Sequence, residues 1–397
     1  MRIDTEATST AHTVPVTLST DHAGSAEEIV RLRRDLHAHP EVAFAEARTT
    51  AVIVEHLSGL GLSPRVLPRG TGAICDLGGA AGPLIALRAD IDALPLDDPK
   101  DVAYRSQLPG VCHACGHDAH TAILLGVASA LAGAELPGRV RLIFQPGEEQ
   151  MPGGALDVIA AGGMDDVAQI YALHCDPRLD AGLVGLRTGG ITAACDHVEI
   201  QLTGSGGHTA RPHLTGDVVY ALGRLITEVP GLLSRRVDPR AALSLVWGAV
   251  EAGHAANAIP ADGTLRGTVR VFDRDAWHAA EGLIRSLVEE VAVSSGVRAV
   301  TSYRRGVPPV VNDAGAVDVQ RAAVVAALGP DALADTAQSM GGEDFAWYLD
   351  HAPGALARLG VAKPGVAERL DLHQGTFDLD ETALDVGVRF TVALAHA

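Results

Sequence analysis

Apolar residues recur along the chain in two spacings, and these separate the predicted helices from the predicted strands. Four segments have apolar residues three or four positions apart, which is typical of a helix with one buried face: 27–36, 45–60, 119–131 and 154–161. Four shorter runs are apolar at successive positions, as in strands covered on both faces: 72–77, 84–87, 140–144 and 170–173. Their alternation predicts an α/β domain with a mainly parallel sheet.

The middle of the chain has a different pattern. Strand-like and helical segments follow one another in the order β-α-β-β-α-β: 197–203, 217–233, 242–250, 264–271, 274–294 and 297–304. This order is that of a ferredoxin-like α+β sandwich. We therefore expect a flexible N-terminus at 1–25, an α/β domain formed by 26–190 and 307–397, and an inserted α+β domain at 191–306.

The charge and the cysteines restrict the class of protein. With a formal net charge of −18, nucleic acid and anionic membranes are poor partners. No apolar run has the roughly 18 residues of a spanning helix, and residues 1–25 do not resemble a secretory signal. Five scattered cysteines, an odd number, suit reduced thiols in the cytoplasm better than a disulfide framework.

Several strand-like runs lead directly into polar residues that bind metals. The run 84–87 precedes Asp90, the run 140–144 precedes Glu148 and Glu149, and the run 170–173 precedes His174. Ligands of open α/β sheets bind beyond the carboxyl ends of the strands, so these groups are expected to converge on one crevice.

The densest group of candidate ligands is the stretch 112–120, Cys-His-Ala-Cys-Gly-His-Asp-Ala-His. Thiolate and imidazole suit zinc or a similar ion, and carboxylates extend the range towards manganese. Three other interpretations remain: structural residues, a redox pair formed by Cys112 and Cys115, and a Cys nucleophile with His117 as its base. Together with the strand-end carboxylates, the stretch favours a metal site.

Glu148 and Glu149 are adjacent, and in an extended segment their side chains point in opposite directions. One carboxylate can then bind a metal while the other handles protons near the substrate. A solvated acidic turn is the alternative, and the apolar strand just before the pair disfavours it. His373 and the loop 341–345 are not informative by themselves.

Six segments together resemble the two-metal aminoacylase and carboxypeptidase family of metallopeptidases, in its amidohydrolase branch of hippurate hydrolases, N-acyl-amino-acid amidohydrolases and auxin-conjugate hydrolases. The segments occur in the family's order from about residue 30 to the end: 88–95, 113–120, 145–149, 206–213, 257–260 and 341–345. His-Ala-Cys-Gly-His-Asp followed by Glu-Glu is highly specific. The resemblance implies a zinc-aminopeptidase-like catalytic domain with a lid that also forms dimers or higher homo-oligomers.

The resemblance also implies roles for individual residues. Two divalent ions, Mn²⁺, Zn²⁺ or Co²⁺, are expected on five ligands: Cys115, His117, Glu149, His174 and His373. Cys115 is expected to bridge both ions, Glu148 to act as the general base, and Asp90 to orient a ligand. On the lid, His208 is expected to stabilise the oxyanion, and Arg211 and Asn257 to bind the substrate.

The expected function is metal-dependent hydrolysis of the amide bond of a small N-acyl amino acid. A dipeptidase or small-peptide metallopeptidase with the same centre is the nearest alternative. A cysteine-nucleophile hydrolase and a non-catalytic metal-binding protein are alternatives from other classes.

Overall fold

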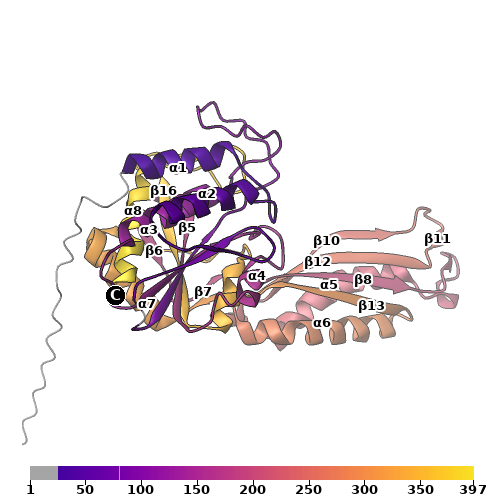
Figure 1. Ribbon diagram of the computed structural model, residues 1–397. Helices are drawn as coiled ribbons and strands as arrows, with labels where there is room; N and C mark the ends of the chain where they lie inside the picture. Colours follow the sequence, from indigo (N-terminus) through magenta and orange to yellow (C-terminus); the bar gives the residue numbers. More distant parts are fainter. Residues whose placement is uncertain (1–25, 80) are drawn as a thin grey trace, which may run out of the picture.

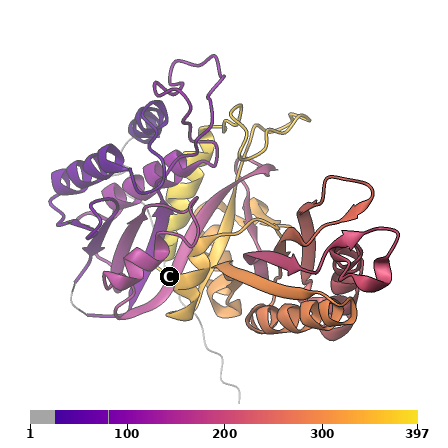
Figure 2. The ribbon, with the colours of Figure 1, turned by 90° about the vertical axis from the view of Figure 1, so that its right-hand side faces the viewer.

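The computed structural model describes residues 26–79 and 81–397, so the expectation of a flexible segment at 1–25 lies outside the described residues. The described part of the chain forms two bodies, each around its own sheet, and the smaller one extends away from the larger (Figures 1 and 2). Each body has its own apolar core.

The larger body is built on a mixed sheet. In spatial order its strands are β1 (Arg65–Val66), β2 (Ala73–Leu77), β4 (Arg139–Gln145), β3 (Leu84–Asp90), β5 (Val167–Asp180), β16 (Gly354–Ala362), β6 (Val184–Leu186) and β15 (Leu333–Asp335). The central neighbours β4, β3, β5 and β16 run parallel, whereas β1–β2, β2–β4 and β16–β6 are antiparallel. The predicted α/β class with a mainly parallel centre is confirmed.

Helices cover both faces of this sheet. One face carries α1 (Ala26–Ala38), α2 (Ala47–Gly59), α3 (His117–Leu131), α7 (Ala314–Leu328) and α8 (Thr382–Ala395). The other face carries α4 (Ala155–Ala160) and the 3₁₀ helix η4 (Asp344–Asp350). Because α3 packs against both the sheet and the helices α1 and α8, it is buried on nearly all sides and lacks a polar face.

The smaller body is an antiparallel sheet with two helices. Its spatial order is β10 (Ser244–Ala252), β12 (Asp262–Arg270), β8 (Cys195–Thr203) and β13 (Arg298–Val307). The helices α5 (Val218–Arg236) and α6 (Arg274–Ser294) pack together on one face, and their apolar residues form the core with the inner residues of the strands. This is the ferredoxin-like order expected from the sequence.

The chain enters and leaves the smaller body at one place. β7 (Gly189–Thr192) precedes it and β14 (Val310–Asn312) follows it, and these two strands pair antiparallel. We therefore propose 191–306 as the inserted unit, with 26–190 and 307–397 forming the larger body. Among the described residues, no helix combines the length and the apolar character needed to cross a membrane.

A buried ion cluster joins the first, third and last helical regions of the larger body. Arg33 of α1 contacts Asp118 of α3 at 2.8 Å, Asp378 at 2.9 Å and Glu381 at 3.4 Å. The same Asp118 carboxylate is 2.7 Å from Nδ1 of His37. Since Arg33 and Asp118 have no exposed side-chain surface, each charge depends on the other for compensation.

We predict that Arg33→Met destabilises the protein by about 3–5 kcal/mol, because the buried Asp118 loses its arginine partner and keeps only the contact with His37. Arg31→Met, on the same helix with a 75% exposed side chain, is the matched control and should change stability by less than about 0.5 kcal/mol. Urea unfolding followed by circular dichroism measures both. Equal effects of the two substitutions would contradict a stabilising role of the cluster.

Candidate metal centre

The candidate ligands come from the ends of neighbouring strands and from the start of α3. β3 ends at Asp90, β4 ends shortly before Glu148 and Glu149, and β5 contains His174. Because β4, β3 and β5 are parallel neighbours, these positions lie at the same edge of the sheet. The fold therefore brings the strand-end residues to one place.

Gly116 sets the geometry of the two candidate ligands that flank it, Cys115 and His117. It adopts a left-handed conformation with φ 87° as the N-cap of α3. A Cβ atom at this position would lie 2.8 Å from Sγ of Cys175. Glycine is thus required for the close approach to β5, and the turn places Cys115 just before the helix and His117 at its first position.

The five candidate ligands form two overlapping groups. Ligand atoms of Cys115, His117 and His174 lie within 4.8 Å of one another, and so do those of Cys115, Glu149 and His373. Cys115 Sγ is 3.6 Å from His174 Nε2, and Glu149 Oε1 is 3.3 Å from His373 Nε2. Because Cys115 belongs to both groups, its sulfur has the position that a ligand shared by two ions needs.

His373 reaches this place from a loop near the C-terminus. Its φ of 61° is left-handed, which is uncommon outside glycine and often marks a functional position. The His373 N–H donates to the Ala114 carbonyl at 2.8 Å, so the loop is joined to the 112–120 stretch. Lys100 Nζ donates to the Gly375 carbonyl at 3.0 Å and holds the other side of the loop.

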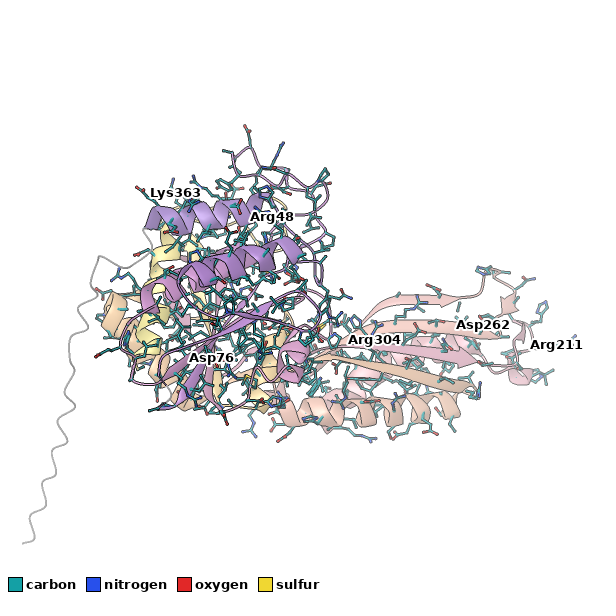
Figure 3. All side chains as sticks on the ribbon, in the orientation of Figure 1. Arg48, Asp76, Arg211, Asp262, Arg304 and Lys363 are labelled. Atoms are coloured by element: carbon teal, nitrogen blue, oxygen red, sulfur yellow. The ribbon has the colours of Figure 1, made fainter. Side chains whose placement is uncertain are left out.

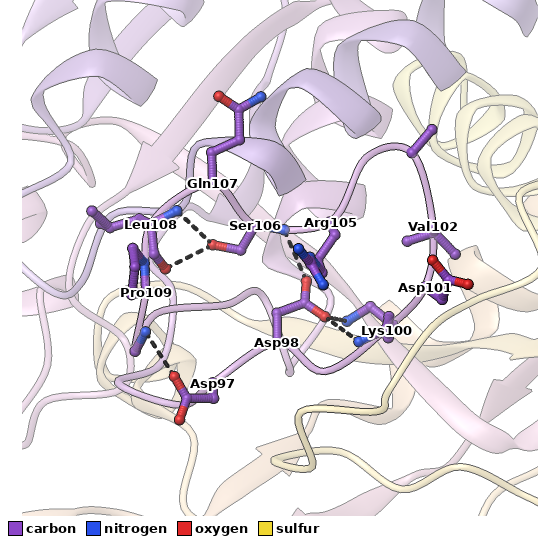
Figure 4. A pocket seen from close by; sticks show the side chains of 12 residues that line it. Asp97, Asp98, Lys100, Asp101, Val102, Arg105, Ser106, Gln107, Leu108 and Pro109 are labelled. Atoms are coloured by element: carbon purple, nitrogen blue, oxygen red, sulfur yellow. Dashed lines mark hydrogen bonds and ion pairs between the residues drawn. The ribbon is translucent and has the colours of Figure 1, made fainter.

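Lys100 belongs to a long segment, 97–110, that lines a hollow of ≈ 540 Å³ (Figure 4). The hollow is acidic, but Asp97 and Asp98 accept hydrogen bonds from backbone N–H groups of the same segment. None of the five candidate ligands lines it. We therefore interpret the segment as a support for the His373 loop rather than as the reaction site.

The chemistry of the ligand groups fits a bound cation. His117 Nε2 is buried without a hydrogen-bond partner among the described residues, and the ionic neighbours of the buried Glu149 Oε1 there are His373 and His117. Burial lowers the pKa of His117, but Asp90 and Asp92 outweigh it and raise that pKa to about 10. The surrounding negative charge therefore attracts a positive charge to this point, and a divalent ion supplies it as well as a proton does.

The candidate ligands His174 and Cys115 also suit a bound cation. Burial, and then the positive charge of Arg358, lower the pKa of His174 well below its usual value, so its imidazole is neutral and able to bind a metal. Burial and Glu149 raise the pKa of the Cys115 thiol, so the thiolate forms only when a cation stabilises it.

Glu148 differs from Glu149 in its surroundings. The Glu148 side chain is buried beside Glu343 and Asp344, and burial with the charges of Glu343 and Glu149 raises its pKa well above the usual range. The local backbone departs from the expectation, because both glutamates lie in a turn and not in an extended segment. As a result, both carboxylates come within 4.8 Å of His117, which an extended chain disfavours.

The structure also shows residues that orient the candidate ligands. Asp90 Oδ1 lies 2.5 Å from His120 Nδ1, and His120 Nε2 accepts the Cys175 N–H at 2.9 Å. Asp92 Oδ1 is 3.2 Å from His117 Nδ1, and Asp92 Oδ2 accepts the Glu149 N–H at 2.9 Å. Such contacts fix the direction of a ligating group.

Sequence reasoning assigned a role to Asp90 but none to His120 or Asp92. The positions of His120 and Asp92 in the sequence could have indicated these roles. His120 follows His117 by three residues and so lies on the same side of α3, and Asp92 lies two residues beyond Asp90, the last residue of β3.

The three lid residues lie elsewhere. His208 is in β9 (Gly207–His208), which pairs with β11 (Ala258–Ile259), and the Thr209 N–H donates to the Asn257 carbonyl. β11 and Arg211 are at the tip of the smaller body, far from the larger one (Figures 1 and 3). All three predicted lid residues are exposed. Within one chain, the structure does not bring them to the candidate ligands.

Residues 86–397 match peptidase family M20/M25/M40, and the match includes all the candidate ligands. The chain belongs to this family. This confirms the resemblance to the aminoacylase and carboxypeptidase family of metallopeptidases that the sequence motifs indicate. It also confirms the expected class, a metal-dependent amidohydrolase.

Individual relatives in this peptidase family cover almost the whole chain. The chain is 37% identical over 373 residues to the N-acetyl-L-cysteine deacetylase of Bacillus subtilis, covering 93% of this chain and 87% of that protein. It superposes with a TM-score of 0.81, at 34% identity, on a dinuclear metal-binding M20 peptidase of Bacillus subtilis, covering 93% and 97% of the two chains.

A longer relative is also similar. The chain is 52% identical over 370 residues to a protein named putative glutamate–cysteine ligase 2-3 of Rhodococcus jostii. The match covers 93% of this chain but only 46% of that protein, so this chain spans about half the length of that relative.

We predict that Cys115→Ala lowers the number of Mn²⁺ or Zn²⁺ ions bound per chain, because the sulfur belongs to both ligand groups. Cys75→Ala is the matched control, since Cys75 is equally buried but lies in β2, outside the groups. Both variants are loaded with metal, desalted and measured by plasma mass spectrometry. Full metal content in Cys115→Ala would contradict the shared-ligand assignment.

Proposed function

We propose that the protein hydrolyses the amide bond of small N-acyl amino acids, with Cys115, His117, Glu149, His174 and His373 holding two divalent ions. The two overlapping ligand groups that share Cys115 carry the proposal. When bound, such ions polarise a carbonyl group and make a water molecule more acidic. The other requirements of the reaction are met by groups of the chain itself.

Glu148 is the proposed general base. It lies beside the ligands His117 and Glu149 but at the buried end of the turn, next to Glu343. Its raised pKa means that the carboxyl group holds a proton more tightly than an exposed glutamate does. That property suits a residue that takes a proton from water and then returns it to the leaving amine nitrogen.

The proposed substrate class comes from the relatives as well as from the site. The relative from Bacillus subtilis named N-acetyl-L-cysteine deacetylase and the plant relative named IAA-amino acid hydrolase ILR1-like 4, from Arabidopsis thaliana, support linear N-acyl amino acids. Two thermostable carboxypeptidases of Saccharolobus solfataricus, each 31% identical, favour a second candidate, a peptidase that uses the same centre.

The class of reaction is tested by removing and restoring the metal. Purified protein is stripped with a chelator and assayed on N-acetyl amino acids and dipeptides while Mn²⁺, Zn²⁺ or Co²⁺ is added back. We expect activity to vanish and return, and to be higher on N-acetyl amino acids than on dipeptides. The reverse preference would favour the peptidase, and activity that survives stripping would point to a cysteine nucleophile.

We predict that Glu148→Gln lowers kcat by about 10²–10⁴-fold with unchanged metal content, because it removes a proton-transfer group and no ligand. Glu55→Gln, an exposed position on α2, is the matched control and should retain full activity. Steady-state kinetics and metal analysis measure both. Near-normal turnover in Glu148→Gln would exclude this residue as the base.

We further propose that His208, Arg211 and Asn257 reach the substrate of a second copy of the chain. Arg211 and β11 lie at the tip of the smaller body, His208 pairs with β11, and Asn257 directly precedes it. If so, His208→Ala and Glu148→Gln proteins should each be nearly inactive, yet a mixture of the two, unfolded and refolded together, should regain activity. Mixing restores one intact site, because Glu148 and His208 then come from different copies. No recovery in mixed dimers would show that both residues act within one chain.

A further inference from the structure

Three arginines are buried in the described part of the chain, and one of them lacks a partner. Arg33 and Arg88 each contact three carboxylates. Arg358 forms no hydrogen bond or salt bridge with the described residues, although it is only 6% exposed and its Nε is completely buried. A buried charge without a partner is strongly unfavourable, so it is retained only where it has another use.

Arg358 lies beside the candidate ligands. It is in β16, directly opposite His174 of the parallel strand β5. Residues at paired positions of adjacent strands project from the same face of the sheet, so the Arg358 and His174 side chains are neighbours. The charge of Arg358 also interacts with Asp176, Glu343 and the candidate ligand Cys115. The guanidinium group is therefore at the edge of the proposed reaction site.

The nearby carboxylates are already engaged by other groups. Asp176 receives two bonds from the Arg178 side chain, at 2.9 and 2.7 Å. Glu343 contacts Arg88 at 3.1 Å and accepts the Phe345 N–H at 3.0 Å. Burial lowers the pKa of Arg358, and the charges of these acids do not offset that effect. The described residues thus leave the hydrogen-bonding capacity of Arg358 unused.

We propose that Arg358 binds a carboxylate of the substrate. The inference rests on the proposed function, because an N-acyl amino acid carries a carboxylate close to the amide bond that is cleaved. A guanidinium group matches a carboxylate with two parallel N–H···O bonds and fixes its orientation as well as its position. Arg358 would thus set specificity from the rigid sheet, in addition to any contribution of Arg211 from the lid.

The test compares two pairs of substrates. The first pair, N-acetylmethionine and N-acetylmethionine amide, differs only in the α-carboxylate. The second pair, N-acetylglutamate and N-acetylglutamine, differs only in a side-chain carboxylate. The variants are Arg358→Met and Arg358→Lys, and Arg321→Met, an exposed position on α7, is the matched control. Metal content is measured for each variant.

We expect Arg358→Met to lower the preference for one carboxylate, measured as a ratio of kcat/KM values, by about 10- to 100-fold, the loss typical of a charged hydrogen bond. Arg358→Lys should lie in between, and Arg321→Met should match the wild type. Loss in the first pair identifies the α-carboxylate, and loss in the second pair a side-chain carboxylate. An equal loss on all four substrates, with both ratios unchanged, would overturn the proposal and indicate a structural role.

A binding measurement separates failure of this inference from failure of the proposed function. Metal-loaded Glu148→Gln protein is titrated calorimetrically with N-acetylmethionine and N-acetylglutamate, with and without Arg358→Met. The substitution should raise at least one Kd by about tenfold or more. Unchanged Kd values would overturn the role of Arg358 even if hydrolysis is established. If the wild type hydrolyses no substrate but Arg358→Met still raises the Kd, the proposed reaction is refuted and the carboxylate-binding role of Arg358 is retained.

Discussion

Arg88 contacts Asp90 at 2.7 Å, Asp344 at 2.8 Å and Glu343 at 3.1 Å, and none of these side chains is more than 4% exposed. Three carboxylates so close together in a dry interior repel one another strongly, and a guanidinium group, which remains charged in proteins, compensates them. Asp90 is then free to orient His120. Asp344 accepts bonds from the Gln145 side chain and from the N–H that begins α4. The strand ends and the η4 side of the site therefore depend on this one cation.

The positive charge of Arg88 compensates the supporting carboxylates but not the candidate ligands. Neither Glu148 nor Glu149 contacts an arginine or a lysine within the part of the chain described, and Glu149 has only histidines as ionic neighbours. Against the opposing effect of burial, Asp90 and Asp92, and after them Glu149, raise the pKa of His117 to about 10. The supporting carboxylates are compensated by Arg88, whereas the candidate ligands are not. Such a site favours a bound cation, because the cation supplies the missing positive charge.

The sequence was sufficient for features that repeat locally. Periodicity gave both sheets and the order of the smaller body, and strand ends followed by polar residues gave the edge where Asp90, Glu149 and His174 meet. It was insufficient where distant segments decide the outcome. The turn that contains Glu148 and Glu149 is held by distant carboxylates, since the Gly147 N–H donates to Glu46 and the Glu149 N–H to Asp92. The local sequence does not show that Arg88 has carboxylate partners and Arg358 has none among the described residues. The single arginine in the otherwise apolar strand 354–362 was nevertheless a signal that this position is unusual.

The position of a specificity residue determines when it can act. Arg358 and His174 sit opposite each other on paired strands of the large sheet, so their separation is fixed before any substrate arrives. His208 and Asn257, the proposed lid contacts, lie on the exposed tip of the smaller body, and to act they would have to reach the substrate by movement or from a second copy. A carboxylate bound first by the sheet would orient the scissile amide before the lid residues contact it. Because preorganised groups lose less entropy on binding, the sheet then contributes affinity and the lid contributes closure.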